Sequence, residues 1–104
     1  MGDASNITLS NCDFAGNAGG YTVGGIVGYG SAEVHLGGNS VNRGTITASQ
    51  TAGGIIGYFT AGSNISTAYN LGTVTGGAGA EGIAGGIIGE SKANIKITDC
   101  VNTG

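Results

Sequence analysis

Hydrophobic residues recur along this chain in two short patterns. Apolar and polar positions alternate in segments such as 94–98 (NIKIT), and "TIT" at 45–47 is matched by "TVT" at 73–75. A pair of adjacent aliphatic residues instead follows Gly-Gly in "VGGIVGY" (23–29), "AGGIIGY" (52–58) and "AGGIIGE" (84–90). Period-two alternation with β-branched residues predicts strands. Glycine occupies 24 of 104 positions, which disfavours helix because each interior glycine costs about 1 kcal/mol relative to alanine.

These patterns belong to one repeating unit. "VNRG", "YNLG" and "VNTG" place Asn42, Asn70 and Asn102 at spacings of 28 and 32 residues, close to the spacing of the Gly-Gly pairs. Each unit contains an alternating strand, a Thr-apolar-Thr segment and the Gly-Gly segment. The extra residues "GGAGAEG" at 76–82 account for the longer step.

Three short strands joined by Gly and Asn turns predict an all-β protein, a β-solenoid with one coil per unit of about 28 to 32 residues. Its coils would stack at about 4.8 Å. We expect a single domain over 1–104, with coils over about 4–31, 32–61 and 62–90 and a partial coil over 91–104. Because the chain begins and ends within the first strand of the unit, we expect unpaired strand edges at both ends.

Stacked coils would place equivalent side chains in columns. Asn42, Asn70 and Asn102 are expected to form a ladder of stacked amides at one corner. The expected core ladder is Ile26, Ile55 and Ile87 on the third wall and Ile46 and Val74 on the second, with Ile7, Leu9, Val34, Leu36, Ile65, Ile95 and Ile97 on the first.

The run "GGIIGYFTAGSNISTAYNLGTVTG" resembles the GLUG motif of bacterial surface proteins, and three imperfect copies cover nearly the whole chain. Glu90 departs from the motif where tyrosine is expected, and Phe14 where asparagine is expected. The resemblance implies an extracellular or cell-surface repeat region that accompanies larger adhesins and peptidases without being their catalytic part.

Composition and charge exclude several functions. The net charge is −3, and the basic residues Arg43, Lys92 and Lys96 do not cluster with aromatic residues, which argues against a nucleic-acid partner. No apolar run approaches the roughly 18 residues that a membrane-spanning helix needs. The chain is therefore expected to have no membrane span.

Catalytic, cofactor and metal sites are not expected. The single histidine, His35, has Glu33 two residues away, but this pair is more simply an exposed polar strand face. Gly77, Gly79 and Gly82 match G-x-G-x-x-G without the helix that a dinucleotide site requires. The carboxylates are scattered, with no calcium-type cluster.

The two cysteines, Cys12 and Cys100, occupy equivalent positions three coils apart. That distance, roughly 14 Å, is too long for an internal disulfide. One interpretation is a column of small buried residues, with Ser40 and Ala68 between them. The other is an inter-subunit contact, in which Cys100 of one copy meets Cys12 of the next.

Two outward surfaces are candidates for interaction. Strict alternation would expose Val27, Ile56 and Ile88 beside Tyr29 and Tyr58 as a lateral interface, whereas a corner at Gly-Gly would turn both aliphatic residues inward. Thr45, Thr47, Thr73 and Thr75 would form a two-by-two grid that resembles the arrays of solenoid ice-binding proteins, or would simply reflect β-propensity.

The sequence therefore predicts a non-enzymatic structural repeat protein of the cell surface or extracellular space. We expect copies of the protein to associate head to tail through uncapped ends, as in a filament. The alternatives are an ice-binding protein, or a spacer or adhesion module from a larger surface protein.

Overall fold

The computed structural model describes residues 3–4, 7–10, 12–31, 34–79 and 82–104. Within these residues the chain forms sixteen strands and no helix. All strand pairings are parallel and join segments about one repeat apart, so the chain is all-β with a solenoid-like arrangement. The molecule measures 31 × 25 × 19 Å along its principal axes.

The strands form four sheets. Sheet A contains β1 (Asp3–Ala4), β5 (Val27–Gly30), β9 (Ile56–Phe59) and β14 (Ile88–Ser91). Sheet B contains β2 (Ile7–Ser10), β6 (Val34–Gly37), β10 (Ser63–Ser66) and β15 (Ile95–Thr98). Sheet C contains β3 (Asp13–Phe14), β7 (Ser40–Asn42), β11 (Ala68–Asn70) and β16 (Val101–Asn102). Sheet D contains β4 (Asn17–Gly24), β8 (Thr45–Gly53), β12 (Val74–Thr75) and β13 (Ile83–Gly85).

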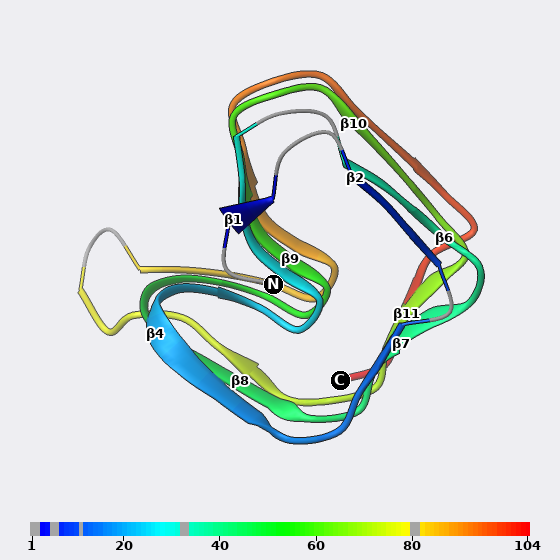
Figure 1. Ribbon diagram of the computed structural model, residues 1–104. Coiled ribbons are helices and arrows are strands. Elements are labelled where there is room, and N and C mark those ends of the chain that lie inside the picture. Colours follow the sequence, from blue (N-terminus) through cyan, green and yellow to red (C-terminus); the bar gives the residue numbers. More distant parts are fainter. Residues whose placement is uncertain (1–2, 5–6, 11, 32–33, 80–81) are drawn as a thin grey trace.

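From β2 onward, the chain contributes strands to sheets B, C, D and A in this order and then repeats the order with the next strand of each sheet (Figure 1). We call each passage a layer: the first is β2–β5, the second β6–β9, the third β10–β14, and the fourth consists of β15 and β16. Each layer thus has four sides, whereas the sequence predicted about three strands per repeat. The missed strands are those of sheet C, which are only two or three residues long.

The turn before sheet C uses the same backbone geometry in three layers. Asn39, Thr67 and Asp99 have φ angles of 60°, 53° and 53°. Asparagine and aspartate tolerate this left-handed region, but a β-branched residue is strained there. The chain therefore turns inward at one fixed position, which brings Ser40 and Asn42 into the interior.

The core lies between the sheets in two adjoining clusters. One is formed by Ile26, Val27, Leu36, Ile55, Ile56, Phe59, Ile65 and Ala68, and the other by Val23, Ile46, Ala48 and Ala52. Of the predicted core ladder, Ile26, Ile46 and Ile55 are buried, whereas Ile87 and Val74, nearer the end of the stack, are half-buried. On the first wall, in sheet B, Leu36 and Ile65 are buried, whereas the side chains of Ile7, Leu9 and Val34 lie outside the described part of the structure.

The Gly-Gly phrase forms a corner between sheets D and A. A Cβ atom on Gly57 would lie 2.6 Å from the carbonyl oxygen of Gly28 and 2.8 Å from that of Val23, closer than real Cβ atoms approach. A Cβ atom on Gly53 would meet the Ile56 carbonyl and, at 2.7 Å, the Gly89 nitrogen. Glycine is required here because sheet D and sheet A backbones come into direct contact.

The same corner decides the orientation of the paired aliphatic residues. The amides of Ile26 and Val27 both donate to the carbonyl oxygen of Ile55, at 2.9 and 3.1 Å. Two consecutive amides on one acceptor interrupt the alternation, so both side chains turn inward, and Val27 and Ile56 have no exposed surface. The prediction of a lateral apolar stripe, which assumed strict alternation, is therefore wrong, and the alternative of a corner that turns the aliphatic residues inward holds at Val27 and Ile56.

The longer third repeat is accommodated within sheet D. β12 pairs with β8 at Ile46 and Thr47, and β13 pairs with the same strand from Thr51 to Gly53. The additional residues lie between these two strands. The layers above and below consequently keep their register.

Candidate functional site

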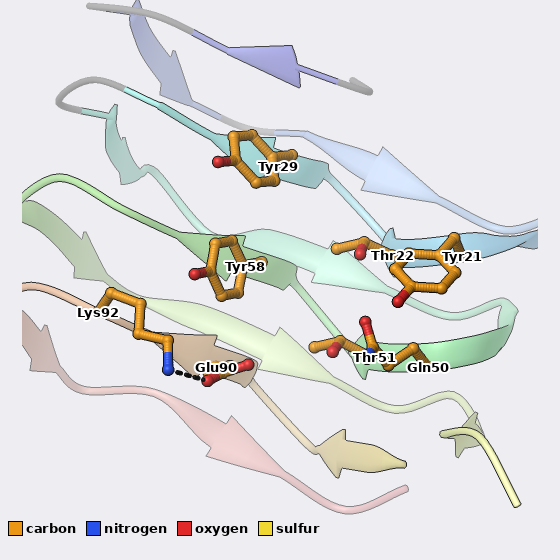
Figure 2. Close-up of a pocket in the computed structure, with 8 residues that line it drawn as sticks. All are labelled: Tyr21, Thr22, Tyr29, Gln50, Thr51, Tyr58, Glu90 and Lys92. Atoms are coloured by element: carbon orange, nitrogen blue, oxygen red, sulfur yellow. Dashed lines mark ion pairs between the residues drawn. The ribbon is translucent and has the colours of Figure 1, made fainter. Parts of the chain in front are cut away.

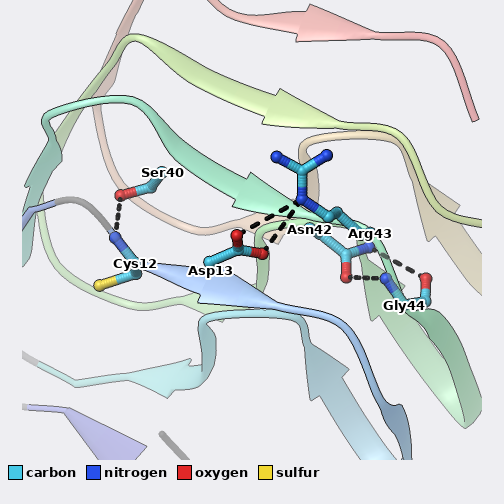
Figure 3. A network of polar contacts seen from close by, with 6 residues as sticks. All are labelled: Cys12, Asp13, Ser40, Asn42, Arg43 and Gly44. Atoms are coloured by element: carbon cyan, nitrogen blue, oxygen red, sulfur yellow. Dashed lines mark hydrogen bonds and ion pairs between the residues drawn. The ribbon is translucent and has the colours of Figure 1, made fainter.

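The asparagines of sheet C form a column of hydrogen-bonded carboxamides. Asn42 donates through Nδ2 to Oδ1 of Asn70 over 2.7 Å, and Asn70 donates in the same way to Asn102 over 2.7 Å. The Asn42 and Asn70 carboxamides also contact the backbone two residues ahead. The Gly44 amide donates to Asn42 Oδ1 at 3.0 Å (Figure 3). Asn70 Nδ2 donates to the Gly72 carbonyl at 3.1 Å. The column therefore has a direction, with donors facing the later layers.

The corner glycines lie directly against this column. A Cβ atom at Gly25 would meet the side chain of Asn42, and Cβ atoms at Gly54 and Gly86 would meet those of Asn70 and Asn102. Asn42 and Asn70 are completely buried, whereas Asn102 is exposed. Burial of a polar amide is tolerated because both groups of each carboxamide have partners.

Phe14 occupies the position before Asn42 in the column. The backbone register pairs Phe14 with Asn42, and the half-buried ring packs against both core clusters. A Cβ atom on Gly44 would lie 2.7 Å from Cε2 of Phe14. An aromatic ring, which needs no hydrogen-bond partner, thus closes one end of the amide column.

The other end of the stack is uncovered. Ile97 stands in the same column as Ile65, yet Ile97 is 48% exposed and Ile65 only 1%. β14, β15 and β16 each have a single neighbouring strand in the described structure. This end face, defined here by Ile97, Asn102 and the free edges of these three strands, is the principal candidate for interaction.

Cys12 and Cys100 stand at opposite ends of one column in sheet C, in register with Ser40 and Ala68 between them. Neither cysteine forms a disulfide in the described part of the chain, and both residues are half-buried. The Ser40 hydroxyl donates to the Gly37 carbonyl at 2.9 Å and accepts from the Cys12 amide at 3.3 Å (Figure 3). An ion pair between Arg43 and Asp13, with Nε and Oδ1 3.3 Å apart, lies beside this column on the surface.

A groove of about 350 Å³ runs along the corner on its outer side (Figure 2). The rings of Tyr29 and Tyr58 stack on one wall with centroids 5.2 Å apart and an interplanar angle of 25°. Glu90 follows Tyr58 in register and holds Lys92, with Oε1 and Nζ 2.8 Å apart. This hydrogen bond and the Glu90 charge raise the pKa of Lys92 above its ordinary value. The groove is lined by Tyr21, Thr22, Tyr29, Gln50, Thr51, Tyr58, Glu90 and Lys92.

The sequence singled out Tyr29 and Tyr58 as a possible lateral face, but it predicted no groove and missed the residues of the opposite wall. Thr22 and Thr51 both stand two residues before Gly-Gly, and they pair in register across β4 and β8. That recurrence was visible in "YTVGG" and "QTAGG". The recurrence did not by itself predict a groove, because the two walls meet only through the chain reversal at the Gly-Gly corner.

The threonine grid lies on the outer face of sheet D. Thr75 pairs in register with Thr47, and Val74 pairs with Ile46. Ile46, which lies between Thr45 and Thr47 in the sequence, is fully buried. All four threonines, Thr45, Thr47, Thr73 and Thr75, are exposed. In the first layer Asn17 and Gly19 take the corresponding places.

Comparisons with protein-family models, with curated proteins and with solved structures gave no match.

The described residues contain no group of three His, Cys, Asp or Glu side chains placed to hold a metal ion. His35 is exposed, with Nδ1 3.2 Å from Asn64 Nδ2, and Glu33 lies outside the described residues. Within the same part of the chain, no helix is long and apolar enough to cross a membrane. The best-defined chemistry of this molecule is hydrogen bonding and apolar contact between layers.

Proposed function

We propose that the protein is a non-enzymatic structural β-solenoid module of the cell surface or extracellular space, which lengthens by addition of further β layers to its end face. The location rests on the resemblance to GLUG repeats. The observation that carries the proposal is the contrast between equivalent residues inside and at the end of the stack. Ile97 and Asn102 are exposed where Ile65 and Asn70 are buried.

A further layer would repeat contacts that already exist within the molecule. Backbone amides and carbonyls at the free edges of β15 and β16 would pair in parallel, as β10 does with β15 and β11 with β16. Covering Ile97, which is 48% exposed, would remove the remaining half of an apolar side chain from water, and full burial of such a side chain from water is worth about 1.5–3 kcal/mol. Both a second copy of the protein and a further repeat segment carry strands suited to such a contact.

The proposal predicts that an added repeat folds onto the end face. A copy of residues 45–72 fused after Gly104 supplies strands equivalent to β8, β9, β10 and β11 in the natural chain order. In a repeat array, stability grows with each interface between neighbouring layers. We expect the urea m-value and the free energy of unfolding to increase over those of the parent chain. An added segment that stays unfolded, with unchanged m-value and fast amide exchange, would contradict the proposal.

A second candidate function is ice adhesion through the threonine grid. The exposure and register of Thr47 and Thr75 above the buried Ile46 favour it. Thr45→Lys with Thr73→Lys should abolish thermal hysteresis if the grid binds ice, while Thr98→Lys on sheet B should leave it unchanged. Absence of hysteresis in the unmodified protein would eliminate this function.

A further inference from the structure

The two ends of the amide column differ in their chemistry. At the Phe14 end, Asn42 Oδ1 accepts from the Gly44 amide, and Phe14 occupies the neighbouring place in the column with its ring against Gly44. At the other end, the carboxamide of Asn102 accepts from Asn70 and is exposed. The donor of each earlier asparagine faces the following layer. If an added layer continued this pattern, it would present an acceptor to the Asn102 Nδ2 group.

We infer that the end face carrying Asn102 selects a β layer with asparagine in the column position, and that the Phe14 face of a second copy does not fit it. This inference rests on the proposed function and names its partner: another asparagine-glycine repeat of the kind found in layers two to four. The existing contacts from Asn42 to Asn70 and from Asn70 to Asn102 are its template.

The alternative contact, Asn102 against Phe14 of a second copy, leaves a donor without an acceptor. The strands of the second copy would cover Asn102, as β16 covers Asn70. An aromatic ring accepts only a weak N–H···π contact in place of a carboxamide oxygen. Leaving a buried donor without an acceptor lowers the equilibrium constant for docking by about tenfold or more.

The backbone around Phe14 reinforces this selection. The Phe14 ring extends over Gly44 and packs between the two core clusters, so it is part of its own layer and is not available to move aside. A layer with asparagine instead places a compact amide in the column. The sequence suggested head-to-tail stacking of identical copies. This stacking is therefore the less favourable contact.

The fusion with a copy of residues 45–72 after Gly104 tests this directly. Three versions are compared: the unmodified copy, and copies carrying Asn70→Phe or Asn70→Leu in the added segment only. Leucine matches asparagine in size but offers no acceptor. We expect amides in the added strands of the unmodified fusion to exchange with solvent at least about tenfold more slowly than those in either variant. The Asn102 carboxamide protons should become protected in the unmodified fusion alone.

Each outcome has a distinct meaning. If all three added segments dock with equal protection, the inference is overturned while the proposed function stands. If none docks, the added asparagine layer does not bind and both are overturned. Sedimentation and mild oxidation of the unfused chain give a further check: end-to-end assemblies linked by a Cys12–Cys100 disulfide between copies would overturn the inference.

Discussion

Asn42 and Asn70, 28 residues apart in the chain, are joined by a hydrogen bond of 2.7 Å between their side chains in the interior. The bond is one step of a column that crosses three layers, and the Asn42 and Asn70 side chains are also held by hydrogen bonds to the backbone. Because the central asparagine serves both neighbours, the column behaves as a connected polar network.

Replacing Asn70 should destabilise the fold more than replacing either neighbour. Asn70→Leu removes the acceptor of Asn42 and the donor to Asn102 and to the Gly72 carbonyl. We expect a loss of about 3 kcal/mol in the free energy of unfolding, since each buried group left unsatisfied costs about 1–3 kcal/mol. The exposed Asn102→Leu should cost less than about 1 kcal/mol by urea denaturation. Equal losses at the two positions would show that the column contributes nothing specific.

Much of this architecture was predictable from spacing. The period places Ile46 beside Val74 and Asn42 beside Asn70, and the backbone registers agree with both pairings. Strict alternation failed at the corner, where the amides of Ile26 and Val27 share one acceptor and both side chains turn inward. A hydrogen bond of this kind joins different layers, so the local sequence alone does not reveal it.

The tight turns before sheet C offer a test of backbone strain. Thr67 has a φ angle of 53°, whereas the equivalent residue one layer earlier is Asn39, with a φ angle of 60°. Left-handed geometry costs an ordinary residue roughly 1–2 kcal/mol, and asparagine adopts it more readily. Thr67→Asn should therefore raise the free energy of unfolding by about 1 kcal/mol, measured by urea denaturation.

The reciprocal change serves as the control for that strain. Asn39→Thr introduces the β-branched side chain into the same geometry and should destabilise the protein by a similar amount. If both substitutions lower stability, side-chain contacts outweigh backbone strain at this turn.

The cysteine column predicts which disulfides form. Cys12 and Cys100 are separated by three strand spacings, roughly 14 Å, whereas a disulfide requires Cα atoms within about 7 Å. Oxidation should therefore produce no bond between them within one molecule. In Ser40→Cys, the new thiol would stand one strand from Cys12, about 4.8 Å away, and should form an internal disulfide.

Thiol titration and peptide mapping after mild oxidation distinguish these cases. The Ser40→Cys protein should retain one free thiol, at Cys100, and Cys100→Ser in the same background should retain none. A bond between Cys12 and Cys100 in the unmodified monomer would mean that the two ends of the column are closer than three strand spacings.

The tyrosine wall of the groove should extend by one ring in Glu90→Tyr. Glu90 stands in register with Tyr58, whose ring already stacks on Tyr29 with centroids 5.2 Å apart. A further stacked pair is worth about 0.5–1.5 kcal/mol beyond its buried area. The ion pair lost with Lys92 is formed at the surface, with the Lys92 side chain 60% and the Glu90 side chain 27% exposed, so we expect its contribution to be small. We expect a higher free energy of unfolding, whereas Glu90→Gln, which removes the charge without adding a ring, should leave it nearly unchanged. If Glu90→Tyr gains nothing over Glu90→Gln, or if the gain survives in a Tyr58→Ala background, stacking along this wall does not stabilise the layers.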